Sequence, residues 1–298
     1  MVLAAMVLVH CGPASAAPEK CAAPRSESVS TLSALFPTPG VVVGLALGSG
    51  STHGLAHIGV IEELEARGLG VHVVAGTSVG ALIGSLWASG MTGRQIEELG
   101  RRTDWQVAGN FAWSWQGLLS SRKLAQRLRG AFKDRPIESW PRRFGAVATN
   151  LANGHRRIFM SGDGALAVQA SSALPVLFIP VTIDGEKFAD GALVEPVPVD
   201  AARELGADFV IAVDVAYRSY EEPANGFIDY AFQSIHIVTN ALSAREIRDA
   251  DVGIHLDLHR LLMKCGDDAL VEAGREAVRN AWPEIERKLK LRASPQKH

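Results

Sequence analysis

The alternation of apolar runs and polar breaks predicts two consecutive strand–loop–helix units after residue 40. Residues 41–47 form a short apolar run rich in β-branched side chains, which is typical of a buried strand. In residues 54–67 apolar side chains recur at helical spacing, and Gly68 follows as a C-terminal cap. The same order returns as a strand pattern at 71–75 and a helix pattern at 81–88. Two such units in succession indicate a parallel sheet with helices on its faces.

The rest of the chain continues this α/β pattern. Residues 183–189 are strand-like with a turn at Asp184-Gly185. Further buried strands are predicted at residues 144–149, 157–160 and 209–215. Helices are predicted at residues 122–132, 199–205, 228–247 and 270–289. The fold class is therefore α/β, a three-layer α/β/α domain with a mainly parallel central sheet.

The N-terminal segment differs from the rest of the chain. Residues 1–17 combine an apolar run with small residues around Ala14-x-Ala16, which predicts a secretory signal peptide. Residues 18–39, rich in Ser, Ala and Pro, predict a linker. The folded domain is expected at 40–260, followed by a C-terminal helical extension at 261–298. A working signal implies a periplasmic or membrane-associated protein, and without one the protein is expected in the cytoplasm.

Composition narrows the function classes. The 298 residues carry a formal net charge of −2 and are 47% hydrophobic, which suits a compact domain with a real core. Near charge balance and the lack of a long basic run exclude electrostatic capture of nucleic acid. The sequence has no paired cluster of metal ligands, so neither a metal nor a cofactor is expected. Cys21 and Cys265 can pair in an oxidising compartment or remain free thiols.

A G-x-S-x-G pattern lies between the second predicted strand and its helix, at Gly76, Ser78 and Gly80. A sharp turn in this context holds the serine in a strained conformation and projects its Oγ above the sheet. The glycines leave room for the strand and the helix to pass closely. The pattern favours a nucleophilic serine at Ser78, with a structural glycine turn as the alternative.

A second glycine- and serine-rich loop, residues 48–54, joins the first strand to its helix. Such a loop exposes backbone N–H groups at a helix N-terminus and can bind an anion. The third glycine of a dinucleotide fingerprint and the Lys-Ser/Thr of a phosphate loop are missing. An oxyanion hole serving Ser78 fits better, because the two loops follow neighbouring strands.

Asp190-Gly191 follows a strand-like stretch and can present a carboxylate into a cleft, although this dipeptide alone more often marks a turn. Together with the two loops it forms a recognisable order of motifs. The sequence resembles the bacterial patatin-like phospholipases, a family that includes the catalytic region of neuropathy target esterase. The matching blocks are residues 48–60, 76–81, 170–180 and 190–208, within a span of 41–215.

This resemblance implies a Ser–Asp dyad without a catalytic histidine. Ser78 takes the position of the nucleophile and Asp190 that of the general base. The positions that supply oxyanion-hole amides are Ser49, Gly50 and Ser51, and the supporting motif positions are His53, Gly54, Gly76, Gly80 and Gly191. The family usually has Arg where this chain has His53. The implied substrates are phospholipids, lysophospholipids or other acyl esters, reached by contact with a membrane surface.

Two other readings remain open. A conventional α/β-hydrolase triad can be written with Ser78, Asp190 or Asp214, and His255 or His259. The second alternative is a lipid-binding protein that keeps the fold but no longer catalyses a reaction. His53 in place of the usual Arg favours this alternative slightly. Residues 105–119, with three tryptophans, predict either a lid that touches lipid or ordinary core packing.

Overall fold

The computed structural model describes residues 40–102, 110–114, 117–216, 226–258, 261 and 267–293, and structural statements below concern these residues. The predicted signal peptide, the linker, both cysteines of the possible pair and His259 lie outside them and stay predictions. The predicted lid at 105–119 is described only as the backbone of a separate hairpin, β3 (Asn110–Ser114) with β4 (Gly117–Ser120). Its role therefore stays a prediction too.

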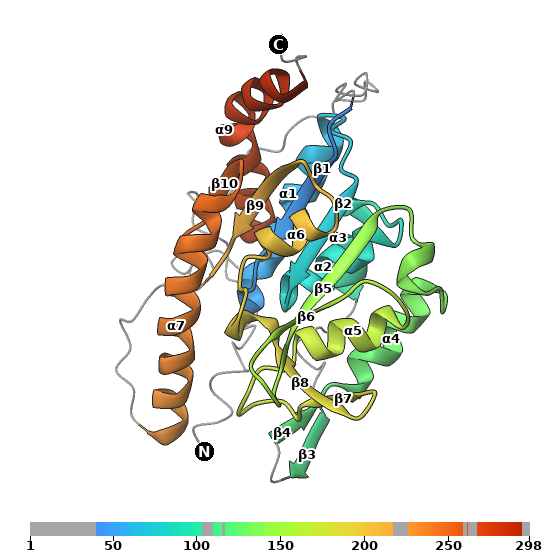
Figure 1. Cartoon of the computed structure of the whole chain (residues 1–298), viewed down its shortest axis with the longest axis vertical. Coiled ribbons are helices and arrows are strands. Elements are labelled where there is room, and N and C mark those ends of the chain that lie inside the picture. Colours follow the sequence, from blue (N-terminus) through green and yellow to red (C-terminus); the bar gives the residue numbers. More distant parts are fainter. Residues whose placement is uncertain are drawn as a thin grey trace, which may run out of the picture.

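A mixed, mainly parallel sheet forms the centre of the molecule (Figure 1). Its order is β10-β9-β1-β2-β5-β8-β7, with β6 paired to β5. The parallel strands are β1 (Val43–Leu47), β2 (Val73–Thr77), β5 (Arg143–Asn150), β9 (Phe209–Asp214) and β10 (Val252–His255). Three antiparallel strands complete the sheet: β6 (Arg156–Phe159), β7 (Val181–Ile183) and β8 (Glu186–Asp190). The predicted α/β class and mainly parallel sheet are confirmed.

Helices cover both faces because alternate strand residues enter two different cores. Val43, Leu45 and Leu47 of β1 pack into the larger core, whereas Ala46 points into the smaller one. The larger core is covered by α1 (Ala56–Ala66), α2 (Val79–Ala88), α3 (Gly93–Arg102), α4 (Arg122–Phe132), α5 (Gly164–Ser171) and α9 (Asp267–Ala293). The smaller core is covered by α6 (Val199–Glu204) and the end of α7 (Phe227–Asp249). These are the three predicted layers.

Several helices and turns lie where the sequence predicts them, and a few elements of the structure were not predicted. Helix α4 occupies the predicted range, and α7 and α9 extend beyond theirs by about one turn or less at each end. The predicted turn at Asp184 and Gly185 has positive φ at both residues, 51° and 83°, and closes the β7–β8 hairpin. Helices α3 and α5 and strand β10 lie in segments for which the pattern predicted no element.

Helix α9 crosses α1 at very short range, and glycines make this possible. A Cβ at Gly59 of α1 would overlap the carbonyl oxygen of Val271, and a Cβ at Gly274 of α9 would overlap that of Ala56. The two backbones therefore pack directly against each other. The C-terminal helix consequently lies on the same layer as the first helix of the domain.

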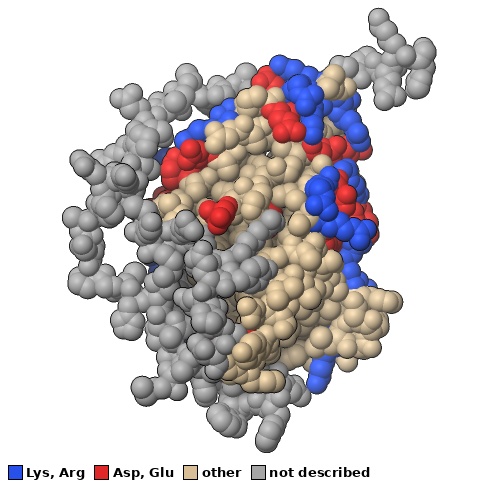
Figure 2. Space-filling view, turned by 90° about the vertical axis from the view of Figure 1, so that its left-hand side faces the viewer, with Lys and Arg blue, Asp and Glu red and all other residues tan. Residues whose placement is uncertain are grey.

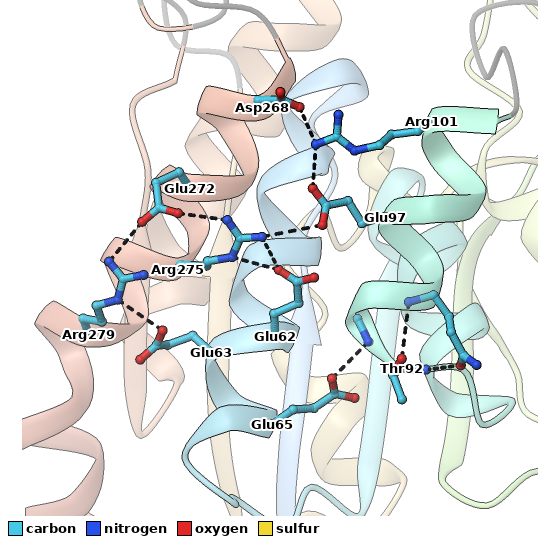
Figure 3. A network of polar contacts seen from close by, with 12 residues as sticks. Glu62, Glu63, Glu65, Thr92, Glu97, Arg101, Asp268, Glu272, Arg275 and Arg279 are labelled. Carbon is cyan, nitrogen blue, oxygen red and sulfur yellow. Dashed lines mark hydrogen bonds and ion pairs between the residues drawn. The ribbon is translucent and has the colours of Figure 1, made fainter. Parts of the chain in front are cut away.

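Ion pairs surround this crossing and join three helices (Figure 3). Arg275 of α9 lies 2.6 Å from a carboxylate oxygen of Glu62 on α1. Arg279 pairs with Glu63 at 3.1 Å. Arg101 of α3 contacts Asp268 of α9 at 2.7 Å. Half-exposed pairs of this kind add modest stability, so the glycine contact is the stronger constraint on the crossing.

The crossing gives a stability prediction. Gly274→Ala would force the backbones of α1 and α9 apart, so we expect its free energy of unfolding to fall by about 1–3 kcal/mol. Urea unfolding followed by circular dichroism measures this change. The matched control is Gly130→Ala on α4, where a Cβ meets nothing within 4 Å and the free energy should rise by about 0.4–1 kcal/mol. Equal effects of the two substitutions would contradict the proposed close packing.

Candidate active site

Ser78 is the single residue between β2 and α2, and it has a backbone conformation that non-glycine residues rarely adopt. Its φ is 57° and its ψ is −123°. A Cβ at Gly76 would lie 2.5 Å from the backbone of Ala81, and one at Gly80 would overlap the carbonyl oxygen of Leu47. Both glycines of the motif are therefore required by close backbone approach. The structure has the sharp strand-to-helix turn that the motif predicts.

Two hydrogen bonds hold this turn in place. The backbone N–H of Ser78 donates to Ser171 Oγ at 3.0 Å, and Ser171, at the end of α5, is fully buried. Thr77 Oγ1 donates to the carbonyl oxygen of Glu195 at 2.8 Å. Glu195 is itself buried and accepts from Arg156 at 2.8 Å. Neither Ser171 nor Glu195 was predicted to have a role, although they lie within the matching blocks 170–180 and 190–208.

Asp190 lies at the end of β8 and faces Ser78. Ser78 Oγ donates to Asp190 Oδ2 at 2.7 Å, and Asp190 Oδ1 accepts from the N–H of Ala192 at 2.9 Å. Thr149 Oγ1 on β5 donates to the Asp190 carbonyl oxygen at 2.7 Å. A Cβ at Gly191 would overlap the carbonyl oxygen of Val147, so the chain can turn here only at glycine. The two residues predicted as a dyad are thus brought into direct contact.

Burial sets the proton affinity of this carboxyl group. The side chain is 2% exposed, and desolvation raises the pKa of Asp190 to about 6, although the hydrogen bonds from Ala192 and Ser78 oppose the rise. At neutral pH the group is an anion that is more basic than an ordinary aspartate. Such a carboxylate can accept a proton from a hydroxyl within hydrogen-bond distance.

The glycine-rich loop after β1 lies directly against the Ser78 turn. β1 and β2 are neighbours in register, with Leu47 opposite Gly76. The loop continues into the short 3₁₀ helix η2 (Ser51–Leu55), and a Cβ at Gly54 would overlap the side chain of Val79. Glycine is therefore required at the predicted supporting position Gly54, because a larger residue would collide with Val79. The loop and the serine turn form one packed unit.

The predicted oxyanion donors separate into two kinds. The N–H of Ser49 already donates to the carbonyl oxygen of Pro196 at 2.9 Å, so the structure contradicts its prediction as an available donor. Within the described residues, the N–H groups of Gly50 and Ser51 have no acceptor in the protein. Ser51 also has a positive φ of 51° at the start of η2. Two of the three predicted amides remain available for an anion.

A buried histidine fixes the start of this loop. His57 Nε2 lies 2.8 Å from the Gly48 carbonyl oxygen, and burial lowers the pKa of His57 to about 4. The ring is therefore neutral at pH 7 and donates its Nε2–H to that oxygen. His57 lies in the matching block 48–60, but no role was predicted for it. His53, by contrast, is 5% exposed within η2, and whether it orders the loop as an arginine would stays a prediction.

Of the two histidines predicted for the alternative triad, His255 lies elsewhere on the sheet, and His259 lies outside the described residues. His255 Nδ1 is 3.1 Å from Asp214 Oδ2, at the ends of β10 and β9. β10 is three positions from β2 in the sheet, which corresponds to roughly 14 Å at the usual strand spacing. The structure therefore pairs Ser78 with Asp190 and pairs His255 with Asp214 separately.

Fold and site together define an α/β protein in which a serine turn and an amide-bearing loop meet at the carboxyl edge of a parallel sheet. Residues 45–203, from β1 to α6, match the model of the family "Patatin-like phospholipase". The chain belongs to the patatin-like phospholipase family. The matched range contains both Ser78 and Asp190.

Individual relatives and structures agree with this assignment. An uncharacterized NTE family protein of Mycobacterium bovis is 35% identical over 176 residues, which is 58% of this chain and 49% of that protein. The lysophospholipase NTE1 of Yarrowia lipolytica is 32% identical over 192 residues, 62% of this chain and 14% of that protein. The crystal structure of VipD from Legionella pneumophila matches with a TM-score of 0.50 at 16% identity, over 85% of this chain and 67% of that one, and supports the fold alone. The chain thus spans about half or less of the relatives' length.

The support of the serine turn can be measured. Ser171→Ala removes the acceptor of the Ser78 N–H, so the free energy of unfolding should fall by about 1–3 kcal/mol. Ser172→Ala is the control, because Ser172 Oγ is buried without a hydrogen-bond partner among the described residues and its loss should cost less than about 0.5 kcal/mol. Both values come from urea unfolding at pH 7. If the two variants unfold alike, Ser171 does not hold the turn.

Proposed function

We propose that this protein hydrolyses carboxylic esters of phospholipids or lysophospholipids through a Ser78–Asp190 dyad. The observation that carries the proposal is the 2.7 Å hydrogen bond from Ser78 Oγ to Asp190 Oδ2 at a strained strand-to-helix turn. Family membership supports a lipid ester as the substrate class. The lysophospholipase named among the relatives supports lysophospholipids as a first substrate to test.

The first half of the proposed reaction acylates the serine. Ser78 Oγ attacks the ester carbonyl carbon while Asp190 Oδ2 accepts the hydroxyl proton. The carbonyl oxygen becomes an oxyanion, and the N–H groups of Gly50 and Ser51 donate to it. The N-terminus of α2, which begins at Val79, adds a favourable dipole near this charge. The tetrahedral intermediate collapses when the alcohol leaves with the proton held by Asp190, and an acyl-Ser78 remains.

The second half releases the fatty acid and regenerates the site. Asp190 accepts a proton from a water molecule as that water attacks the acyl carbonyl carbon. The same two amides hold the second oxyanion. When Ser78 Oγ leaves, it takes back the proton from Asp190. No histidine is needed in either half, because the buried aspartate exchanges protons directly with Ser78, water and the leaving alcohol.

Substitution of the dyad tests this mechanism. We expect Ser78→Ala to lose fluorophosphonate labelling and ester hydrolysis, and Asp190→Asn to reduce hydrolysis by about 10²–10⁴-fold because no base remains. His255→Ala is the control for the triad alternative and should stay within about twofold of the wild type. The measurements are probe labelling and release of fatty acid from lysophosphatidylcholine, with circular dichroism to confirm folding. Hydrolysis by Ser78→Ala, or its loss in His255→Ala, would contradict the dyad.

The proton affinity of Asp190 predicts an acid limb in the rate profile. Its pKa is raised to about 6, so the basic form is present above that pH and disappears below it. We therefore expect kcat/KM to be constant near pH 8 and to fall about tenfold for each pH unit below 6. A water-soluble short-chain ester assayed from pH 4.5 to 8.5 gives this profile. A rate at pH 5 equal to that at pH 7.5 would exclude Asp190 as the base.

A further inference from the structure

Helix α7 exposes an apolar face that the rest of the protein does not cover. Seven large hydrophobic side chains are exposed among the described residues, and four of them lie on α7. These four and the exposed Ala241 follow one another at helical spacing, and we call them the α7 apolar face: Phe227, Tyr230, Ile237, Val238 and Ala241. Phe227 is 85% exposed and Tyr230 60%. One polar residue, the exposed Ser234, lies within this face. An exposed, mainly apolar stripe of this kind marks an interaction surface.

The opposite side of α7 faces the domain and includes the buried polar residues of the helix. Thr239 and Ser243 are its buried residues, and Glu246 Oε2 accepts from the N–H of Val197 at 2.8 Å. Within the described residues, Ile247 is the one hydrophobic side chain of α7 that packs on a core cluster. The half-buried Ile228, Phe232, Ile235 and Leu242 lie on this same side, so α7 carries apolar residues on both its inner and its outer side. Covering the core does not explain the apolar face.

The apolar face lies on the same side of the molecule as the proposed site. In Figure 1 the N-terminal half of α7 projects past the edge of the sheet at which β1 and β2 end. Ser78 directly follows β2 at this edge. α7 also contacts η5 (Gly191–Leu193), which directly follows Asp190. A surface that held the α7 apolar face would therefore lie on the side of the molecule where the ester must enter.

The charge distribution identifies the kind of partner. Residues 227–244 contain Asp229 and no other Asp, Glu, Lys or Arg. Figure 2 shows this side of the molecule, where charged side chains gather in the upper part and much of the lower described surface is uncharged. No helix among the described residues is long and apolar enough to cross a membrane. An apolar, nearly uncharged helix face with aromatic residues fits the boundary between head groups and acyl chains of a neutral lipid layer.

We propose that the α7 apolar face docks the protein on the surface of a zwitterionic phospholipid layer and so presents the lipid ester to Ser78. This inference rests on the proposed function for the substrate but not for the docking itself. Phe227, Tyr230 and Val238 enter the boundary region, while the inner side of α7 stays attached to the domain. Because the five residues of the α7 apolar face carry no charge, docking through them requires no anionic lipid and depends little on salt.

Vesicle binding by the full chain tests the docking face. Phosphatidylcholine vesicles are floated with the wild type and with Phe227→Gln/Val238→Gln, in which glutamine keeps the helix propensity. In the proposed docked state both side chains are buried in the lipid layer. Their removal should therefore weaken vesicle binding at least about tenfold. Leu291→Gln, which replaces a 66% exposed leucine in the last turn of α9, is the matched control and should bind as the wild type does. Equal binding of all three proteins would overturn the proposal.

Activity and assembly measurements separate this proposal from the proposed function. The double variant should hydrolyse a water-soluble ester within about twofold of the wild-type rate, yet lose vesicle hydrolysis in proportion to binding. Ser78→Ala should bind vesicles as the wild type does but should not hydrolyse their lipid. If Ser78→Ala still hydrolysed the lipid, the dyad would be refuted and the docking proposal would stand. Binding that requires phosphatidylglycerol and disappears at high salt would overturn the proposal. So would light scattering that shows a dimer broken by the double variant, because the face would then bind a second copy.

Discussion

The strained backbone at Ser78 is the constraint on which the rest of the site depends. A serine with positive φ is costly, and the surrounding structure must hold it there. The structure does so through close contacts that only glycine allows at positions 76 and 80, and through the hydrogen bond to Ser171. The loop after β1 packs onto the same turn at Gly54. The hydroxyl is thereby fixed at the place where Asp190 and the loop amides can both reach it.

The sequence predicted the parts of the site that carry special backbone geometry. Gly76, Ser78 and Gly80 follow a recognisable pattern, and Asp190-Gly191 became informative once the order of the blocks was considered. The roles of Ser171 and His57 could not be predicted in this way, because each residue acts through one hydrogen bond outside the motif. Ser171 accepts from the distant Ser78 N–H, and His57 donates to the carbonyl oxygen of Gly48 in the preceding loop. Ser49 was wrong as a donor because Pro196, 147 positions later, takes its N–H. A motif shows which backbone is special but not which partner each group finds.

The predicted fold was right where strands are buried on both faces and less complete elsewhere. β1, β2 and β9 read as continuous apolar runs because helices cover both sides of them. Helix α3 places only two large apolar side chains, Ile96 and Leu99, on the larger core, so its apolar stripe is too short for the pattern to reveal. Helix α5 is made largely of small residues and packs on both neighbouring cores, which hides its periodicity. The formation of these two helices therefore depends on tertiary contacts rather than on a local sequence pattern.

The crossing of α1 and α9 has a consequence for the order in which the protein can form. Arg275 and Glu62 are separated by 213 positions, and the outer side of α1 is covered by α9, the last helix among the described residues. During synthesis the sheet strands emerge from the ribosome before α9 does. Until α9 arrives, the outer side of α1 is bare, and the loop that α1 supports lacks its backing. The outer side of α1 is therefore completed only after α9 has been synthesised and has packed against it.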